Sequence, residues 1–304
     1  RSGGWRDYVA GTAWAMIEAG LPVGGFRGLL ASDLPQGAGL SSSAALELAS
    51  ALALSGGDDV AVDRLTLARI AQRAENEYVG VQCGLMDQFA SANGVAGAAL
   101  LLDCRSLTSR AIPLQLDDVA LVVIHSGSER RLEASAYNER RAQCDAAVAV
   151  IAKERDGIRS LRDVTAAMLT EIDKSLDAVL ARRARHVVEE NARVLEAADA
   201  FEAGDHSTVG RLLGESHASL RDLYEVSSPE LDALVEIAGA VPGVFGSRLT
   251  GAGFGGCTVT LVRREAIPEL TAVVEERYPA RTGLMSRLFE VTPSAGAGRV
   301  DGWR

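Results

Sequence analysis

The sequence predicts a two-domain protein that combines helices with strands. Its 304 residues are enough for a sizeable core and, at roughly 100–200 residues a domain, for two domains. Short apolar runs rich in β-branched residues occur up to about residue 125, and an almost purely helical pattern follows from 129 to 239. This change in pattern divides the chain into residues 1–125 and residues 126–304.

Helices and strands are both expected in the first part. Apolar residues that recur every three to four positions predict helices, and short β-branched apolar runs predict buried strands. The expected helices lie over 5–19, 43–56 and 62–79, and the expected strands over 24–33, 98–103 and 119–125.

The pattern changes again after the helical stretch. Residues 241–263 (VPGVFGSRLTGAGFGGCTVTLVR) begin with a glycine-rich loop, and their last part, CTVTLV, alternates as a strand does. A helix over 266–279 and a last strand over 287–291 complete the second part. The sequence shows no internal repeat and no long linker.

Composition excludes several classes of function. The formal net charge of −10 argues against a broad nucleic-acid or anionic-membrane surface. No apolar run is long enough to span a membrane, and no signal peptide is evident. The four cysteines are far apart without a CxxC pair, so we expect a reduced, cytoplasmic protein without a zinc site.

The stretch 33-DLPQGAGLSSSAALELA-49 places glycines and serines at the start of a helix. Serine is a good N-cap, and the glycines Gly37 and Gly39 let a ligand approach the backbone. The free amides and the helix dipole also favour an anion such as a phosphate. Both interpretations stay open for Ser41, Ser42 and Ser43. A Walker A loop is excluded, because neither lysine of the chain, Lys153 or Lys174, lies in a glycine-rich segment.

Two further segments carry candidate chemistry. In 74-AENEYVGVQCGLMDQFASANG-94, Asp87 is expected in a short loop after Gly84. Its carboxylate could activate a hydroxyl group or simply make a turn or cap. The glycines of 251-GAGFGG-256 could close around phosphates or form a tight turn.

Together these stretches resemble the motifs of the GHMP kinases. PQGAGLSSSAA is similar to the family's phosphate-binding loop, and TGAGFGGC to its third motif, with Ala252 in place of a glycine. CGLMDQ and 137-YNERRAQC-144 are typical of the galactokinases within this family. The resemblance covers nearly the whole chain, and its motifs occur in the family's order.

The resemblance implies a two-domain α+β GHMP kinase fold with the active site in the interdomain cleft. Residues 1–125 would be the remainder of the N-terminal ATP-binding domain and residues 126–304 the C-terminal domain. It also implies transfer of the γ-phosphoryl group of ATP, with Mg²⁺, to the anomeric hydroxyl of α-D-galactose.

The resemblance assigns roles to individual residues. Asp87 would be the catalytic carboxylate, and Ser43 and Glu75 would bind the metal. The sugar would be bound by Gly84, Asp87 and Tyr137. ATP and its phosphates would be bound by Gly37, Gly39, Ser41, Ser42, Ser43, Trp5, Tyr8 and Gly253.

One family signature is not found. Galactokinases carry an N-terminal segment of the form RxNLIGEHTDYN that grips the sugar, and the sequence has none. We therefore expect that the start of the first domain is missing and that this chain alone is inactive. The alternatives are a kinase for N-acetylgalactosamine, galacturonate or arabinose, or a non-catalytic galactose and ATP sensor of the same fold. The oligomeric state does not follow from the sequence.

Overall fold

The computed structural model describes residues 1–34, 40–56, 62–128, 133–172 and 175–300. The chain divides into two compact units. The first unit comprises residues 1–114 together with the segment from residue 292 onwards, and the second comprises residues 115–291. The expected boundary at residue 125 differs from this division, because the strand over 119–125 lies inside the sheet of the second unit.

Four α-helices and a π-helical turn make up most of the first unit. They are α1 (Arg6–Glu18), α2 (Ser42–Leu54), α3 (Arg64–Arg73), η1 (Ala74–Val79) and α4 (Met86–Asn93). In α2 the apolar residues Ala44, Leu48 and Ala51 recur on one face and are fully buried. Leu48 and Ala51 pack into a core with Met16 of α1 and Phe89 of α4.

A β-hairpin completes the first unit. Strand β1 (Ala98–Asp103) pairs antiparallel with β2 (Thr108–Pro113). The segment that follows residue 291 returns to this unit, because the Gly97 amide donates to the Pro293 carbonyl and the Ala297 amide to the Ser91 carbonyl. Arg64 of α3 donates to the carbonyls of Ala92 and Ala297 and so ties the returning segment to the helices.

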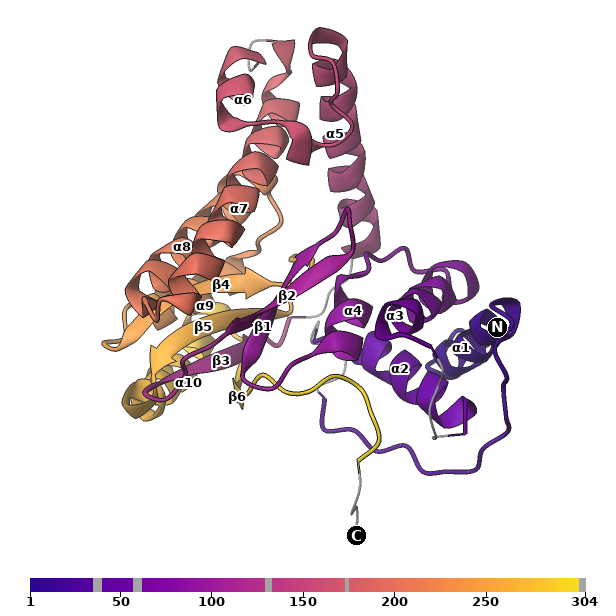
Figure 1. Cartoon of the computed structure of the whole chain (residues 1–304). Coiled ribbons are helices and arrows are strands. Elements are labelled where there is room, and N and C mark those ends of the chain that lie inside the picture. The colour runs from indigo at the N-terminus through magenta and orange to yellow at the C-terminus, as the bar shows by residue number, and fades with distance from the viewer. Residues whose placement is uncertain (35–39, 57–61, 129–132, 173–174, 301–304) are drawn as a thin grey trace. The chain divides into compact units, whose positions relative to one another are not determined.

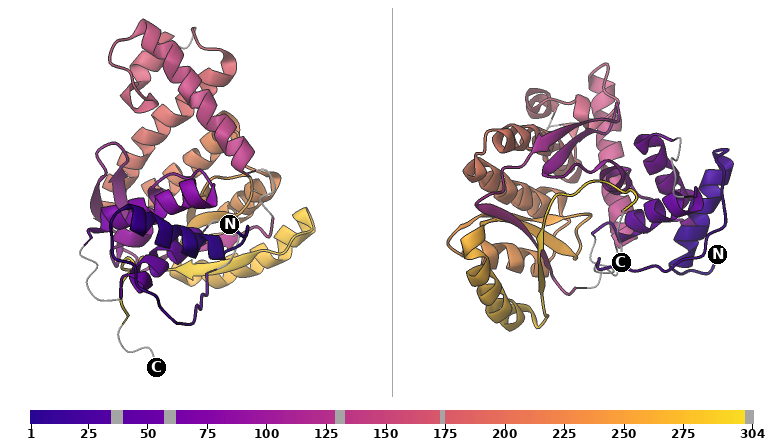
Figure 2. Two further views of the ribbon diagram at one scale, coloured as in Figure 1. Left: turned by 90° about the vertical axis from the view of Figure 1, so that its right-hand side faces the viewer. Right: turned by 60° about the horizontal axis from the view of Figure 1, so that its bottom comes forward.

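The second unit is built on a four-stranded antiparallel sheet in the order β4-β5-β3-β6. Its strands are β3 (Val119–His125), β4 (Val244–Thr250), β5 (Cys257–Arg263) and β6 (Arg287–Val291). Successive residues of β3 bury opposite faces of the sheet. Val122 packs with α9 (Pro229–Gly239) and α10 (Ile267–Thr282), whereas Val119 packs with α7 (Ala178–Glu202) and α8 (His206–Ser219). The sheet is therefore covered by helices on both faces (Figures 1 and 2).

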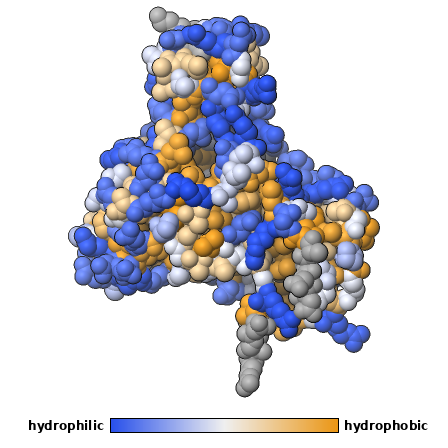
Figure 3. Space-filling model, viewed as in Figure 1, coloured by the Kyte–Doolittle hydropathy of each residue, from blue (hydrophilic) through white to orange (hydrophobic). Residues whose placement is uncertain are grey.

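A helical extension of the second unit has its own small core. It consists of α5 (Glu133–Glu154), the 3₁₀ turn η2 (Leu161–Asp163), α6 (Ala166–Ile172) and the first half of α7. Ala147 and Ile151 of α5 pack against Ala184 and Val188 of α7. Figure 3 shows hydrophilic residues over most of the visible face of this extension. Two short turns, η4 (Leu220–Tyr224) and η5 (Arg264–Ala266), complete the unit.

The observed elements confirm most of the expected ones, overturn one expected strand and add three elements that were not expected. The strand expected over 24–33 is wrong: this segment has no regular structure and no strand partner in the described chain, and Leu29 is 95% exposed. A strand forms only where another strand pairs with it, and the glycines Gly24 and Gly25 add backbone freedom. The elements that the sequence patterns missed are β2, β4 and α4.

Candidate active site

The first turn of α2 carries the three serines. Ser41 is the N-cap residue, but it adopts a left-handed conformation (φ 56°) and its hydroxyl caps no amide of the helix. The N-cap residues of α3, α7, α8 and α9 accept a hydrogen bond from their own first turn, whereas those of α1, α4 and α10, like Ser41, do not. The first-turn amides of α2 thus lack a side-chain cap, and they favour an anion there. Gly37 and Gly39 lie outside the described residues.

Next to this turn lies a buried cluster of polar side chains. Glu47 of α2 is 0% exposed, Glu75 of η1 is 5% exposed and Gln88 of α4 is 1% exposed. The Gln88 Nε2 atom lies 2.8 Å from Glu75 Oε2 and 3.3 Å from Glu47 Oε2. Burial and, to a smaller extent, the charge of Glu75 raise the pKa of Glu47 to about 9.

Glu75 is the point where the cluster meets the serine turn. Its carboxylate accepts hydrogen bonds from the Ser43 hydroxyl and from Cys83. Burial raises the pKa of Glu75, which these hydrogen bonds oppose, and the charge of Asp87 raises it further. Ser43, Glu75 and Asp87 therefore lie in one electrostatic environment, as the family resemblance implies.

Asp87 lies in the first turn of α4 and not in a loop, which corrects the expectation from the sequence. Its side chain is partly exposed, while its neighbour Gln88 points into the buried cluster. No hydrogen bond of the Asp87 side chain is found within the described residues, so the Asx-turn alternative is not supported. A negative charge in the first turn of a helix is stabilised by the helix dipole.

The remaining predicted residues of the first unit differ in their surroundings. Tyr8 lies near the carboxylates, and burial together with the charges of Glu75 and Glu47 raises the pKa of its phenol. Trp5 is exposed at the start of α1, where its ring lies 5.9 Å from the Arg6 guanidinium. Gly84 is exposed in the turn before α4.

The donor set in this part of the unit suits magnesium. The Ser43 hydroxyl and the Glu75 carboxylate are oxygen donors, and Mg²⁺ binds to one or two carboxylates while keeping water and phosphate oxygens as its other ligands. No group of three or more His, Cys, Asp or Glu residues in the described chain could hold a metal on its own. A two-residue site that is completed by nucleotide phosphates is therefore the form that fits.

The glycine-rich loop of the second unit connects β4 to β5. Gly251, Gly253, Gly255 and Gly256 all have positive φ, whereas Ala252 does not. Alanine at position 252 is therefore accommodated without backbone strain. Gly253 is also buried, and a methyl group in its place would collide with the Val226 carbonyl oxygen.

Tyr137 lies on α5 and is 37% exposed, so its side chain can reach a ligand. Three residues further on, Arg140 donates to the carbonyls of Tyr224 (2.8 Å) and Glu225 (3.1 Å). Arg140 is thus a structural residue.

Sequence reasoning missed Glu47 and Gln88 as members of the site. A signal was present for Glu47, because it is the one charged residue in the otherwise apolar helix SSAALELASALAL. Gln88 directly follows the candidate catalytic aspartate, and its role became visible only through its contacts.

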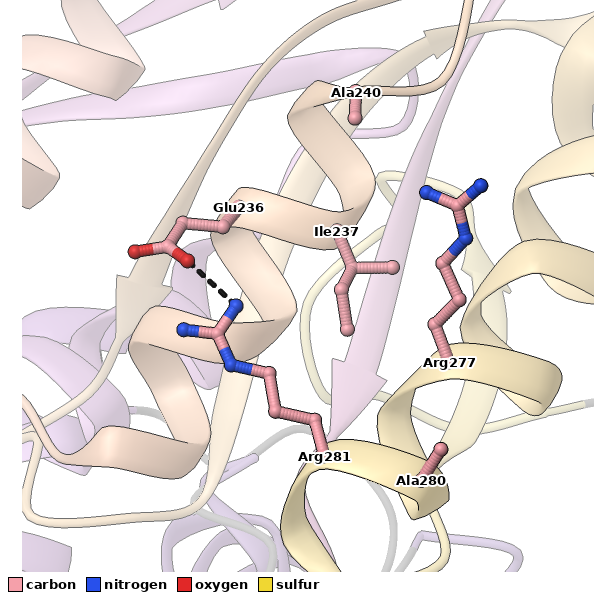
Figure 4. Close-up of a pocket in the computed structure, with 6 residues that line it drawn as sticks. All are labelled: Glu236, Ile237, Ala240, Arg277, Ala280 and Arg281. Carbon is pink, nitrogen blue, oxygen red and sulfur yellow. Dashed lines mark hydrogen bonds and ion pairs between the residues drawn. The ribbon is translucent and has the colours of Figure 1, made fainter.

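A surface hollow in the second unit lies apart from every motif. Glu236 and Ile237 of α9 and Ala240, which directly follows this helix, line it on one side, and Arg277, Ala280 and Arg281 of α10 on the other (Figure 4). The Arg281 Nη1 atom pairs with Glu236 Oε2 at 2.6 Å. With no motif residue in its lining, this hollow contributes nothing to the candidate site.

Comparison with known proteins identifies the class. Residues 7–95 match the model of the GHMP kinases N terminal domain, and residues 197–280 match that of the GHMP kinases C terminal region. The fold also matches Methanococcus jannaschii mevalonate kinase, with a TM-score of 0.58 at 18% identity. None of the described helices is long and apolar enough to cross a membrane.

Nearer relatives narrow the class. The chain is 49% identical to a galactokinase of Roseiflexus sp. (strain RS-1) and 46% identical to one of Chloroflexus aggregans. Each alignment covers 97% of this chain and about three quarters (75% and 76%) of the relative. The crystal structure of Lactococcus lactis galactokinase complexed with galactose matches with a TM-score of 0.89 at 35% identity, over 97% of this chain and 76% of that one. The chain therefore belongs to the galactokinase family of the GHMP kinases.

Proposed function

We propose that this protein transfers the γ-phosphoryl group of ATP to the anomeric hydroxyl of D-galactose. The carrying observation is the uncapped first turn of α2 beside Ser43, Glu75 and Asp87. A turn of free amides binds phosphates, and two carboxylates at its edge provide a metal ligand and a group that can face an acceptor hydroxyl. The family's named relatives support galactose as that acceptor.

The position of each group supports the role that we propose for it. The amides and hydroxyls of Ser41, Ser42 and Ser43 hold the phosphates of ATP in line with the acceptor. Ser43 and Glu75 hold Mg²⁺, which when bound neutralises charge on the phosphate oxygens. Asp87 accepts a hydrogen bond from the sugar hydroxyl and so orients its oxygen toward the γ-phosphorus.

The transition state of phosphoryl transfer is loose, so positioning and charge stabilisation carry most of the catalysis. In the second unit, Tyr137 contacts the sugar and the loop over 251–256 closes on the phosphates. The cysteines form no disulfide within the described residues, which is compatible with the reducing, cytoplasmic setting that we propose.

The experiment is ADP release by the full-length gene product with magnesium-ATP and a panel of sugars. We expect D-galactose to give the fastest turnover and Asp87→Asn to lower kcat by about 10²–10⁴-fold. A faster reaction with N-acetylgalactosamine, galacturonate or arabinose would support the proposed reaction but show that galactose is not the preferred substrate. Binding of ATP and galactose without any turnover would instead identify a sensor.

A further inference from the structure

The amide group of Gln88 joins two carboxylates that lie on different helices. Its nitrogen carries two N–H groups, and the nearest oxygen acceptors are Glu75 Oε2 at 2.8 Å and Glu47 Oε2 at 3.3 Å, with the weaker acceptor Cys83 Sγ at 3.5 Å. All three side chains are at least nine-tenths buried. With both N–H groups used, the Gln88 side chain has little freedom to rotate, and neither has the Glu75 carboxylate that it holds.

Among the described residues, Gln88 is the one hydrogen-bond partner found for the buried Glu47 side chain. Its Oε1 atom makes no hydrogen bond in the described structure, and Gln88 is its hydrogen-bond donor at Oε2. A buried carboxyl group is costly, and an apolar residue at this position of α2 would pack without that cost. What Glu47 supplies is an acceptor that fixes the second N–H group of Gln88.

The same three side chains connect the elements that carry the proposed machinery. Ser43 lies one helical turn before Glu47 on α2, so both project from the same face of that helix. Gln88 directly follows Asp87 on α4, and Glu75 lies on η1. The Gln88 amide therefore sets the distance between the serine turn, the metal-binding carboxylate and the helix of the catalytic aspartate.

We infer that Gln88 is a positioning residue for the magnesium ligand Glu75, and that Glu47 serves to hold Gln88 in that position. This inference rests on the proposed function, because it concerns the metal and nucleotide part of the same site. Supporting groups around a metal ligand change metal affinity by about 10–100-fold when they are removed.

The test measures nucleotide binding rather than turnover. The dissociation constant of a fluorescent ATP analogue is determined for the full-length protein with and without Mg²⁺. The ratio of the two constants is the magnesium enhancement. We expect Gln88→Leu to reduce this enhancement at least about tenfold, while the constant without Mg²⁺ changes less than about twofold.

Variants of Glu47 and Gln72 complete the design. Glu47→Gln keeps an oxygen that accepts from Gln88 and should retain the enhancement, whereas Glu47→Leu should lose it as Gln88→Leu does. Gln72→Leu is the matched control, because the Gln72 amide donates to the Cys83 carbonyl (3.1 Å) and to neither carboxylate. Circular dichroism checks that each variant is folded.

The possible outcomes separate the inference from the proposed function. A folded Gln88→Leu variant with an unchanged enhancement overturns the inference, as does an equal loss of binding without Mg²⁺. If Gln88→Leu does not fold, the two Glu47 variants decide: an equal magnesium enhancement in Glu47→Gln and Glu47→Leu overturns the inference. Sugar turnover by the unmodified protein is measured separately. If the unmodified protein phosphorylates no sugar, but Gln88→Leu still selectively loses the magnesium enhancement of nucleotide binding, the proposed function is rejected and the inference stands.

Discussion

Arg183 on α7 donates from its Nη2 atom to Glu225 Oε2 at a distance of 2.7 Å. The guanidinium group also donates to the Leu223 carbonyl (2.5 Å) and to Gln143 Oε1 (2.8 Å), and the side chain is only 2% exposed. The residue after Glu225, Val226, accepts a hydrogen bond of 2.7 Å from the amide of Phe254 in the glycine-rich loop. Arg183 therefore helps to fix the segment over 223–226, to which the glycine-rich loop is hydrogen-bonded.

Arg183→Leu should lower the free energy of unfolding by about 1–3 kcal/mol, because it removes the donor to the part-buried Leu223 carbonyl and leaves Gln143 Oε1 with only the weaker donor Arg140 at 3.5 Å. Arg182→Leu is the matched control. Arg182 pairs with Oε1 of the same Glu225 at 2.9 Å, but it is well exposed and should contribute less than about 1 kcal/mol. Urea unfolding of the two variants measures the difference, and equal losses would contradict this account of Arg183.

Ser43→Ala should lower kcat/KM for magnesium-ATP by about 10–100-fold. The substitution removes a hydroxyl that hydrogen-bonds Glu75 and that we assign to the metal. Ser55→Ala at the opposite end of α2 is the control, since the Ser55 hydroxyl donates only to the Ala51 and Leu52 carbonyls. Steady-state kinetics measures kcat/KM for both variants. Equal values for Ser43→Ala and Ser55→Ala would show that Ser43 is not part of the site.

Glu47→Gln should become more stabilising as the pH rises. The folded-state pKa of Glu47 is raised from 4.5 to about 9, so its contribution to stability is complete below pH 4.5 and is lost as the pH approaches 9. Glutamine does not titrate and avoids this loss. From about pH 5 to about pH 9, we expect the Tm of the variant relative to the native chain to increase by at least about 2–4 °C.

The control for this prediction is Glu77→Gln. Glu77 is exposed and pairs with Arg73 at the surface, so its substitution should give a Tm difference that changes little with pH. A Glu47→Gln difference that stays constant or shrinks over the same range would show that Glu47 is ionised in the folded protein.

Cys83 should resist alkylation, although its side chain is not fully buried. Burial and the charge of Glu75 raise the pKa of its thiol to about 12, and the reactive species is the thiolate. Cys104 is exposed in the β1–β2 hairpin and should react first with iodoacetamide at about pH 8. Mass spectrometry of the digested protein gives the order, and modification of Cys83 before Cys104 would refute the role of its carboxylate neighbours.

The sequence was informative where local chemistry decides the structure. The apolar period of α2 and the motif residues Ser43 and Glu75 were identified from it, and the structure brings those two residues into hydrogen-bond contact. Long-range contacts decided the rest. The segment over 24–33 has strand-like composition but no pairing partner, and nothing local shows that Gln88 reaches both Glu47 and Glu75.

The return of the last residues to the first unit has a consequence for biosynthesis. A ribosome makes the second unit, residues 115–291, as one uninterrupted stretch, whereas the first unit still lacks the carbonyl of Pro293 and the amide of Ala297 at that time. Domains fold as they emerge when their contacts are already present. The unit that is translated first is therefore completed last. If translation stopped before residue 292, the second unit would have all of its own residues, whereas the first unit would lack the hydrogen bonds of Pro293 and Ala297.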